Sequence, residues 1–211
     1  MKFLVAIPSI RKNTGDTIEK VRATFMYPTD LVIVDGTEGK AQTLNRILRD
    51  WANPSVYHIY VTLDDDFIPC NNWQELVKTA FEKVPSVGSV GIDLSYTEEG
   101  RSYMSSTKST REQYGKLSVF NVAGHIAGCF IAMRTDIAKA VGEIPILGNL
   151  KYQVYEDGWR GFRISQLGFR NILVVGNQTD KMLHFNDSVE YEKNRITAAK
   201  LGYTLYKEYT K

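Results

Sequence analysis

The sequence has little cysteine, no long apolar run and almost no net charge. Cys70 and Cys129 are the two cysteines among 211 residues, and they stand far apart in no metal-binding spacing. Such a pair is typical of two reduced thiols in a cytosolic protein. No apolar run approaches the length of a bilayer span, and the apolar start of the chain is too short for a signal peptide. We therefore expect a cytoplasmic protein without membrane insertion.

The formal net charge of +2 gives little support to a protein held to nucleic acid or membrane by bulk charge. Hydrophobic residues make up 43% of the chain and charged residues 24%, as in an ordinary globular protein. Glycine is scarce after the first predicted strand, because the loop Ser9–Gly15 contains one glycine. This counts against a glycine-rich loop that cradles phosphates.

The most informative stretch is Tyr57–Pro69, which begins as a strand and ends in acids. Its first seven residues are mostly β-branched or aromatic and predict a buried strand, and Asp64, Asp65 and Asp66 follow directly. Adjacent carboxylates repel one another, and hard cations such as Mg²⁺ or Mn²⁺ take oxygen ligands. In open α/β sheets ligands bind beyond the carboxyl ends of strands. The alternative is an acidic turn that caps the next helix.

The first half of the chain alternates strands and helices. Strands are predicted at 2–7, 31–34, 57–63 and 87–94, with helices at 16–25, 41–51 and 73–84 between them. This order is typical of an α/β fold with a mostly parallel central sheet flanked by helices. Predicted helix caps are Asp16, Asn71 or Asn72, and Thr135.

The second half is less regular. Strands are predicted at 117–122, 129–133 and 171–175, and helices at 135–142, 156–168 and 190–211. The stretch 96–115 has no periodicity and predicts a long loop, which in compact domains is usually functional or mobile. Residues 100–116 are locally basic, through Arg101, Lys108, Arg111 and Lys116.

Six segments, in this order, resemble a family 2-like glycosyltransferase of the GT-A fold. They are Val5–Pro8, Val32–Gly36, Gly39–Asn45, Leu63–Asp66, Gly124–Gly128 and Tyr155–Arg160. The resemblance implies one GT-A, Rossmann-like domain over residues 1–211 that depends on a nucleotide sugar. It further implies that residues 1–95 bind the nucleotide sugar and that residues 96–211 serve the acceptor and catalysis.

In the family that this chain resembles, a DxD motif holds a divalent metal beside the donor. Asp64 and Asp66 are similar to that pair, with Asp66 as the direct metal ligand and Asp64 nearer the ribose. Asp65 either positions the residues that bind the donor, without touching the metal itself, or belongs only to the turn. His184 resembles a third metal ligand, and its alternative is a structural histidine.

The resemblance also implies a set of residues that bind the nucleotide. Asp35 is similar to the acid that reads the nucleobase, or else it ends a strand in a turn before Gly36. Lys40 and Asn45 lie on the segment that lines the nucleotide pocket, although Lys40 could equally be a solvated lysine at a helix start. Lys181 is a candidate phosphate contact.

The pair Glu156 and Asp157 resembles the ED motif, whose aspartate is the general base of inverting members. Asp157 would accept the proton of the acceptor hydroxyl as that oxygen attacks the anomeric carbon. The alternative is a pair of acids favoured at a helix start. His125 lies between glycines beside the expected acceptor site, where packing of the loop is the other reading.

The sequence therefore predicts a metal-dependent glycosyltransferase that uses Mn²⁺ or Mg²⁺ and a nucleoside-diphosphate sugar, a UDP-sugar such as UDP-glucose. The QxxRW motif of processive synthases is absent, since Gln166 is followed by Leu-Gly-Phe-Arg. Transfer is thus expected to be non-processive. The acceptor could be a glycan, a protein, a small molecule or a hydroxymethylated DNA base. Alternatives are a nucleotidyltransferase that makes an activated sugar, or a non-catalytic module that binds sugar nucleotides.

Overall fold

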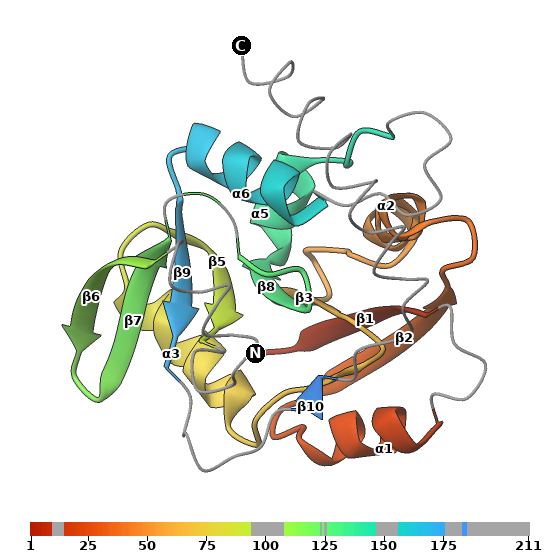
Figure 1. Ribbon diagram of the computed structural model, residues 1–211, viewed down its shortest axis with the longest axis horizontal. Helices are drawn as coiled ribbons and strands as arrows, with labels where there is room; N and C mark the ends of the chain where they lie inside the picture. The colour runs from red at the N-terminus through yellow and green to blue at the C-terminus, as the bar shows by residue number, and fades with distance from the viewer. Residues whose placement is uncertain are drawn as a thin grey trace.

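The computed structural model describes residues 1–9, 15–93, 108–122, 124, 126–146, 156–175 and 183–184, with the backbone alone for 108–109 and 183–184. Its strands are β1 Phe3–Ser9, β2 Thr29–Asp35, β3 Ile59–Leu63, β4 Phe67–Ile68, β5 Val87–Ile92, β6 Lys108–Tyr114, β7 Leu117–Val122, β8 Phe130–Arg134, β9 Arg170–Val174 and β10 Leu183–His184. Its helices are α1 Gly15–Ala23, α2 Lys40–Asp50, α3 Trp73–Lys83, α5 Thr135–Val141 and α6 Glu156–Gln166. Figure 1 shows the sheet between two layers of helices.

Within these ranges one sheet has eight strands in the order β2-β1-β3-β8-β5-β9-β7-β6. The expected α/β class with flanking helices is confirmed, but the sheet is mixed instead of mostly parallel. β1 pairs in parallel with β2 and β3, and β5 with β9, whereas β8 and β7 pair antiparallel with their neighbours. The tight β6–β7 turn accounts for one of the antiparallel pairs, because a short turn can join only antiparallel neighbours, whereas parallel strands need a crossover of a dozen or more residues.

Alternate residues of β1 serve two cores, one on each face of the sheet. Phe3, Val5 and Ile7 pack with side chains of α1 and α3, and Leu4 and Ala6 pack with side chains of α2, α5 and α6. All five residues of β3 are buried, as a central strand covered on both faces requires. The buried strand β3 therefore fixes the position of the residues that follow Leu63.

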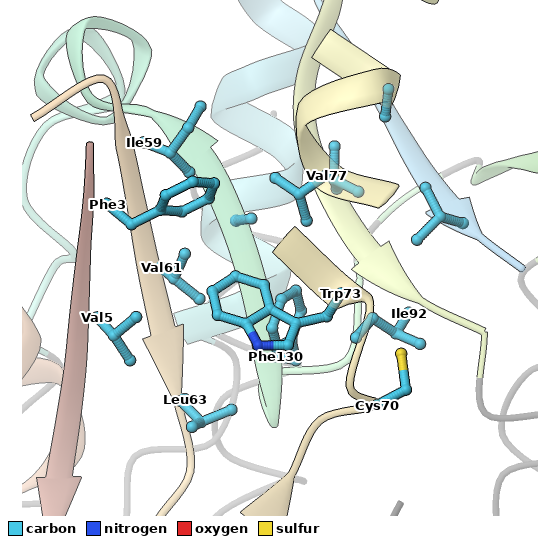
Figure 2. Close-up of a cluster of buried hydrophobic side chains, with 14 of the residues drawn as sticks. Phe3, Val5, Ile59, Val61, Leu63, Cys70, Trp73, Val77, Ile92 and Phe130 are labelled. Carbon is cyan, nitrogen blue, oxygen red and sulfur yellow. The ribbon is translucent and has the colours of Figure 1, made fainter. Parts of the chain in front are cut away.

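Trp73, the first residue of α3, is the largest fully buried side chain on the α1 and α3 face. Its ring lies 5.6 Å from that of Phe3 and 5.3 Å from that of Phe130, both edge on. Figure 2 shows these rings together, with Cys70 nearby. The indole nitrogen of Trp73 donates to Thr24 Oγ1 at 2.9 Å, so its polar atom is satisfied as well.

The predicted caps are wrong in detail. Asp16 lies inside the first turn of α1, where it forms an ion pair with Lys20. Asn72 does occupy the N-cap of α3, but its side chain makes no capping hydrogen bond. Arg134 is the N-cap of α5, which places Thr135 within that helix.

The strands β4, β6 and β10 were not predicted. β6 lies within the stretch expected to be a loop, and β4 follows the acid triplet directly. β10 pairs antiparallel with β4, so a late segment of the chain returns to the end of β3. The predicted helix at 190–211 and most of the predicted loop at 96–115 lie outside the described residues.

Candidate functional site

The three acids Asp64, Asp65 and Asp66 form the connection between β3 and β4. The backbone N–H of Phe67 donates to the Asp64 carbonyl at 3.2 Å, which closes a turn, and the N–H of Asp64 donates to the Cys129 carbonyl at 3.0 Å. All three side chains are half-buried. We call Asp64–Asp66 the acid turn. It lies where the sequence placed it, at the carboxyl end of a buried strand.

The members of the acid turn have different partners. Asp65 accepts a hydrogen bond from Ser9 Oγ at 2.7 Å and is therefore tied to the end of the neighbouring strand β1. Asp64 instead forms an ion pair with Lys40, its Oδ1 atom lying 2.8 Å from Lys40 Nζ. This difference agrees with a supporting position for Asp65, which remains a prediction.

Lys40, the first residue of α2, joins the acid turn to the start of α6. Its ammonium lies 2.8 Å from Asp64 and 2.7 Å from Glu156 Oε1. The Glu156 side chain is 8% exposed, against 29% for Lys40 and 26% for Asp64. Lys40, Asp64 and Glu156 thus form one ion-paired cluster, which we call the Lys40 cluster. A lysine with two carboxylate partners is not the solvated lysine of the alternative reading.

Burial and the ammonium act in opposite directions on the two acids. Burial favours the neutral form of Glu156, but Lys40 outweighs it and holds the pKa of Glu156 below its ordinary value. For Asp64 the effect of burial is the larger one, and it raises the pKa to about 6 against the opposing charge of Lys40. The two carboxylates raise the pKa of Lys40 well above its ordinary value despite burial. The lysine is accordingly charged at neutral pH.

Gly128 closes the Lys40 cluster from a third side. A Cβ atom added there would lie 3.1 Å from Glu156 Oε1 and 3.2 Å from Lys40 Nζ. These contacts are tight, so the backbone packs against the ion pair in a way that a larger residue would disturb. Gly128, the last residue of one of the six segments that carry the resemblance, thus lies next to the acidic residues of two others, while His125 lies outside the described residues.

Asp157 follows Glu156 in the first turn of α6 and is half-buried. Its Oδ1 accepts a hydrogen bond from the backbone N–H of Gly158 at 2.7 Å. This local contact, in the first turn of α6, agrees with the alternative reading of acids favoured at a helix start. The role of Asp157 as a base remains a prediction.

Two buried polar residues that sequence reasoning missed hold α6 in place. Arg160 is 5% exposed and donates to Thr62 Oγ1 of β3 at 3.0 Å. The Asn171 amide group of β9 donates to the Gly161 carbonyl at 3.0 Å. The spacing of Arg160 four residues after Glu156, on the same helix face, was the available signal for its burial.

Asp35 and Asn45 lie on elements next to the Lys40 cluster, but both have structural partners. Asp35 is exposed, and its Oδ1 accepts from the N–H of Thr37 at 2.9 Å, a bond that lowers the pKa of Asp35. The turn reading is thus seen, while base recognition remains a prediction. Asn45 is 4% exposed and bonds both the carbonyl and the N–H of Ile144, at 2.8 and 2.7 Å. Its predicted place in the nucleotide pocket gains no support.

The predicted metal ligands are partly brought together. In the β4–β10 pair, His184 stands opposite Phe67, the residue after Asp66, so the backbone brings it back to the acid turn. Lys181 lies outside the described residues. Among the described side chains, no group of three histidine, cysteine, aspartate or glutamate residues is arranged to hold a metal ion. The two carboxylates of Asp64 and Asp66 remain as oxygen donors, the kind that Mg²⁺ and Mn²⁺ prefer.

Cys129 lies beside the acid turn. Burial raises the pKa of its thiol, and the negative charge of Asp64 raises it further. The thiol is therefore neutral at neutral pH, and the acid turn supplies the charged oxygen atoms of this region.

The architecture is that of a GT-A-like α/β domain. No protein-family model matches the chain, and no curated protein matches it by sequence. Solved structures do match. They include a protein from STIV, with 17% identity and a TM-score of 0.54 over 90% of this chain and 96% of the other. At such identities the likeness concerns the fold.

Two further matches are glycosyltransferases. A mannosyltransferase from Pyrobaculum calidifontis, in complex with GDP-Man and Mn²⁺, is 18% identical with a TM-score of 0.56 over 82% of this chain and 56% of its own. The catalytic domain of Drosophila β1,4-galactosyltransferase 7, in complex with xylobiose, is 13% identical with a TM-score of 0.55, over 92% and 79%. None of the described helices of the present chain is long and apolar enough to cross a membrane.

Proposed function

We propose that this chain is a metal-dependent, non-processive glycosyltransferase that moves a sugar from a nucleoside-diphosphate sugar to an acceptor hydroxyl. The observation that carries the proposal is the Lys40 cluster, which joins the acid turn to the Glu156-Asp157 pair. In the family that the chain resembles, the first of these motifs binds the donor and the second supplies the general base. The two motifs stand far apart in the sequence. Their ion pairs with the same lysine bring them together, as a shared site requires.

The residues fit a divalent cation. Asp64 and Asp66 would hold it, and the backbone register of β10 supports His184 as a third ligand. A metal bound there would supply positive charge to offset that of the diphosphate leaving group. The solved mannosyltransferase binds GDP-Man with Mn²⁺, which supports a nucleoside-diphosphate sugar and a divalent metal in general terms.

Asp157 is proposed to act as the general base. Its carboxylate takes the proton of the acceptor hydroxyl as that oxygen forms a bond to the anomeric carbon, while the bond from this carbon to the diphosphate breaks. Attack from the side opposite the diphosphate inverts the anomeric configuration. Arg160 and Asn171 support this role indirectly, because they fix the position of α6.

For the donor we propose a UDP-sugar such as UDP-glucose, and for the acceptor a glycan or a hydroxymethylated DNA base. Arg111 and Lys116 of the β6–β7 hairpin are exposed and basic, which favours an acceptor rich in phosphate. Binding to such an acceptor would weaken steeply as salt is added. Transfer that is indifferent to salt would argue against DNA.

The test measures the binding of UDP-, GDP- and TDP-sugars by calorimetry and their hydrolysis in a separate assay, each with Mn²⁺, with Mg²⁺ and with EDTA. We expect one donor to bind with metal and to lose its binding in EDTA. Asp66→Asn should abolish hydrolysis and leave the unfolding temperature unchanged. Asp50→Asn, an exposed acid at the end of α2, is the control and should behave as wild type.

Other outcomes are equally clear. If Asp66→Asn hydrolyses the donor at the wild-type rate, the metal assignment is wrong. Release of pyrophosphate from a nucleoside triphosphate mixed with a sugar phosphate would favour a nucleotidyltransferase. Binding of a donor with no turnover toward any acceptor or water would favour the non-catalytic module.

A further inference from the structure

One carboxylate oxygen of Asp64 already has a charged partner. Asp64 Oδ1 lies 2.8 Å from the Lys40 ammonium, a distance at which a charged hydrogen bond is strong. A divalent cation that coordinates Asp64 would therefore lie close to the positive charge of the Lys40 ammonium. Either the lysine withdraws or the cation binds against its repulsion.

We propose that Lys40 is a built-in competitor of the metal: it neutralises Asp64 when the cation is absent and lowers the affinity of the site for the bare cation. The inference rests on the proposed function, since it takes Asp64 and Asp66 as the metal site. It goes further by assigning Lys40 a role before any nucleotide arrives. Binding of metal alone is disfavoured, and binding of metal together with a diphosphate is favoured.

Glu156, the second partner of Lys40, holds the ammonium near Asp64 even when Asp64 binds the cation. Glu156 is almost fully buried and holds the ammonium at 2.7 Å, so Lys40 can release Asp64 without losing its counter-ion. The backbone at Gly128 lies beside the ammonium, since a Cβ added there would be 3.2 Å from Nζ. Lys40 is thus expected to stay close to Asp64 after it yields, and its charge continues to repel the cation.

A nucleoside diphosphate changes the balance. Its phosphates carry negative charge, which the lysine and the metal can share. With the diphosphate present Lys40 is therefore a favourable contact instead of a competitor. Removing the lysine should have opposite effects in the two states: tighter binding of metal alone, and weaker binding of diphosphate in the presence of metal.

The test is titration of Mn²⁺ into nucleotide-free protein, followed by calorimetry, for wild type, Lys40→Met and Lys40→Arg. We expect Lys40→Met to bind Mn²⁺ at least about tenfold more tightly than wild type. Lys40→Arg keeps the charge and should remain weak. Lys83→Met removes one exposed positive charge at the end of α3 and controls for net charge; it should match wild type within about twofold. With saturating Mn²⁺, Lys40→Met should bind UDP or GDP more weakly than wild type.

Equal or weaker Mn²⁺ binding by Lys40→Met would overturn the proposal, as would equal tightening in Lys40→Arg. If Lys40→Met does not fold, because Glu156 loses its counter-ion, Lys40→Met with Glu156→Gln is compared with Glu156→Gln alone, and the same tightening is expected. If no variant and no wild-type protein binds Mn²⁺, the metal site fails and this inference with it. If wild type binds Mn²⁺ but Lys40→Met does not tighten, this inference alone fails.

Discussion

Replacing Asn45 by leucine is expected to destabilise the protein without impairing the donor site. The Asn45 side chain bonds the N–H and the carbonyl of Ile144, at 2.7 and 2.8 Å, and all of these groups are buried. Leucine has nearly the same volume, so the cavity term is small. Each buried group left without its partner costs about 1–3 kcal/mol, and two such groups give a loss of about 3 kcal/mol.

The assay is urea unfolding together with thermal unfolding. A loss of about 3 kcal/mol lowers the unfolding temperature of a chain of this size by about 6–12 °C. Donor affinity, measured by calorimetry well below that temperature, should stay within about twofold of wild type. Gln42→Leu is the matched control on the same helix, because the buried Gln42 Oε1 has no hydrogen-bond partner in the part of the chain that the structure describes. It should change stability by less than about 1 kcal/mol.

The reasoning would be refuted by the reverse pattern. If Asn45→Leu loses less than about 1 kcal/mol but binds the donor tenfold more weakly, Asn45 belongs to the nucleotide pocket, as the resemblance implied. Loss of both properties in the folded protein would mean that the segment around Ile144 itself forms part of the donor site.

Two further predictions concern packing and pH. In Gly91→Ala the new Cβ would lie 2.2 Å from Ile126 Cγ2, so we expect a loss of about 1–3 kcal/mol by urea unfolding. The double variant with Ile126→Ala should lose less stability than the sum of the two single losses, and strict additivity would contradict the predicted clash. The pKa of Glu112 is lowered by its bonds to Tyr114 and Arg170, so its stabilisation is present above the ordinary pKa of a glutamate, about 4.3, and is lost as the pH falls through the lowered value. Glu112→Gln should flatten the decline of stability in this acid range, and an unchanged decline would argue against the contribution.

The elements with a strong local pattern were predicted well. α3 follows the helical period from Trp73 onward, and β3 is an uninterrupted buried strand, so local sequence determines both. β6 was missed because its sequence, Lys-Ser-Thr-Arg-Glu-Gln-Tyr, carries no apolar alternation. In the described sheet β6 is an edge strand with one neighbouring strand. A strand that is partly exposed to solvent on both faces does not need such alternation. The two-residue strands β4 and β10 are defined only by pairing with each other across the chain.

The candidate site was predictable in its residue types but not in its contacts. Asp64 was singled out from its position at a strand end, and Glu156 from the resemblance to the ED motif. The geometry brings both to one ammonium. That Lys40 is this common partner could not follow from sequence, because burial and long-range pairing decide it. Asn45 is the opposite case: its side-chain hydrogen bonds are directed into the fold, and its place in the nucleotide pocket stays a prediction.

The position of β8 between β3 and β5 has a consequence for how the chain is made. During synthesis β3 leaves the ribosome well before β8, and at about 5–20 residues per second the delay is several seconds. For that time a strand whose five residues are all buried in the folded protein, and which ends in repelling acids, lacks the neighbour that covers one of its edges. The nascent chain is therefore vulnerable to aggregation until β8 emerges, and the acids at the end of β3 can keep that edge soluble while it waits.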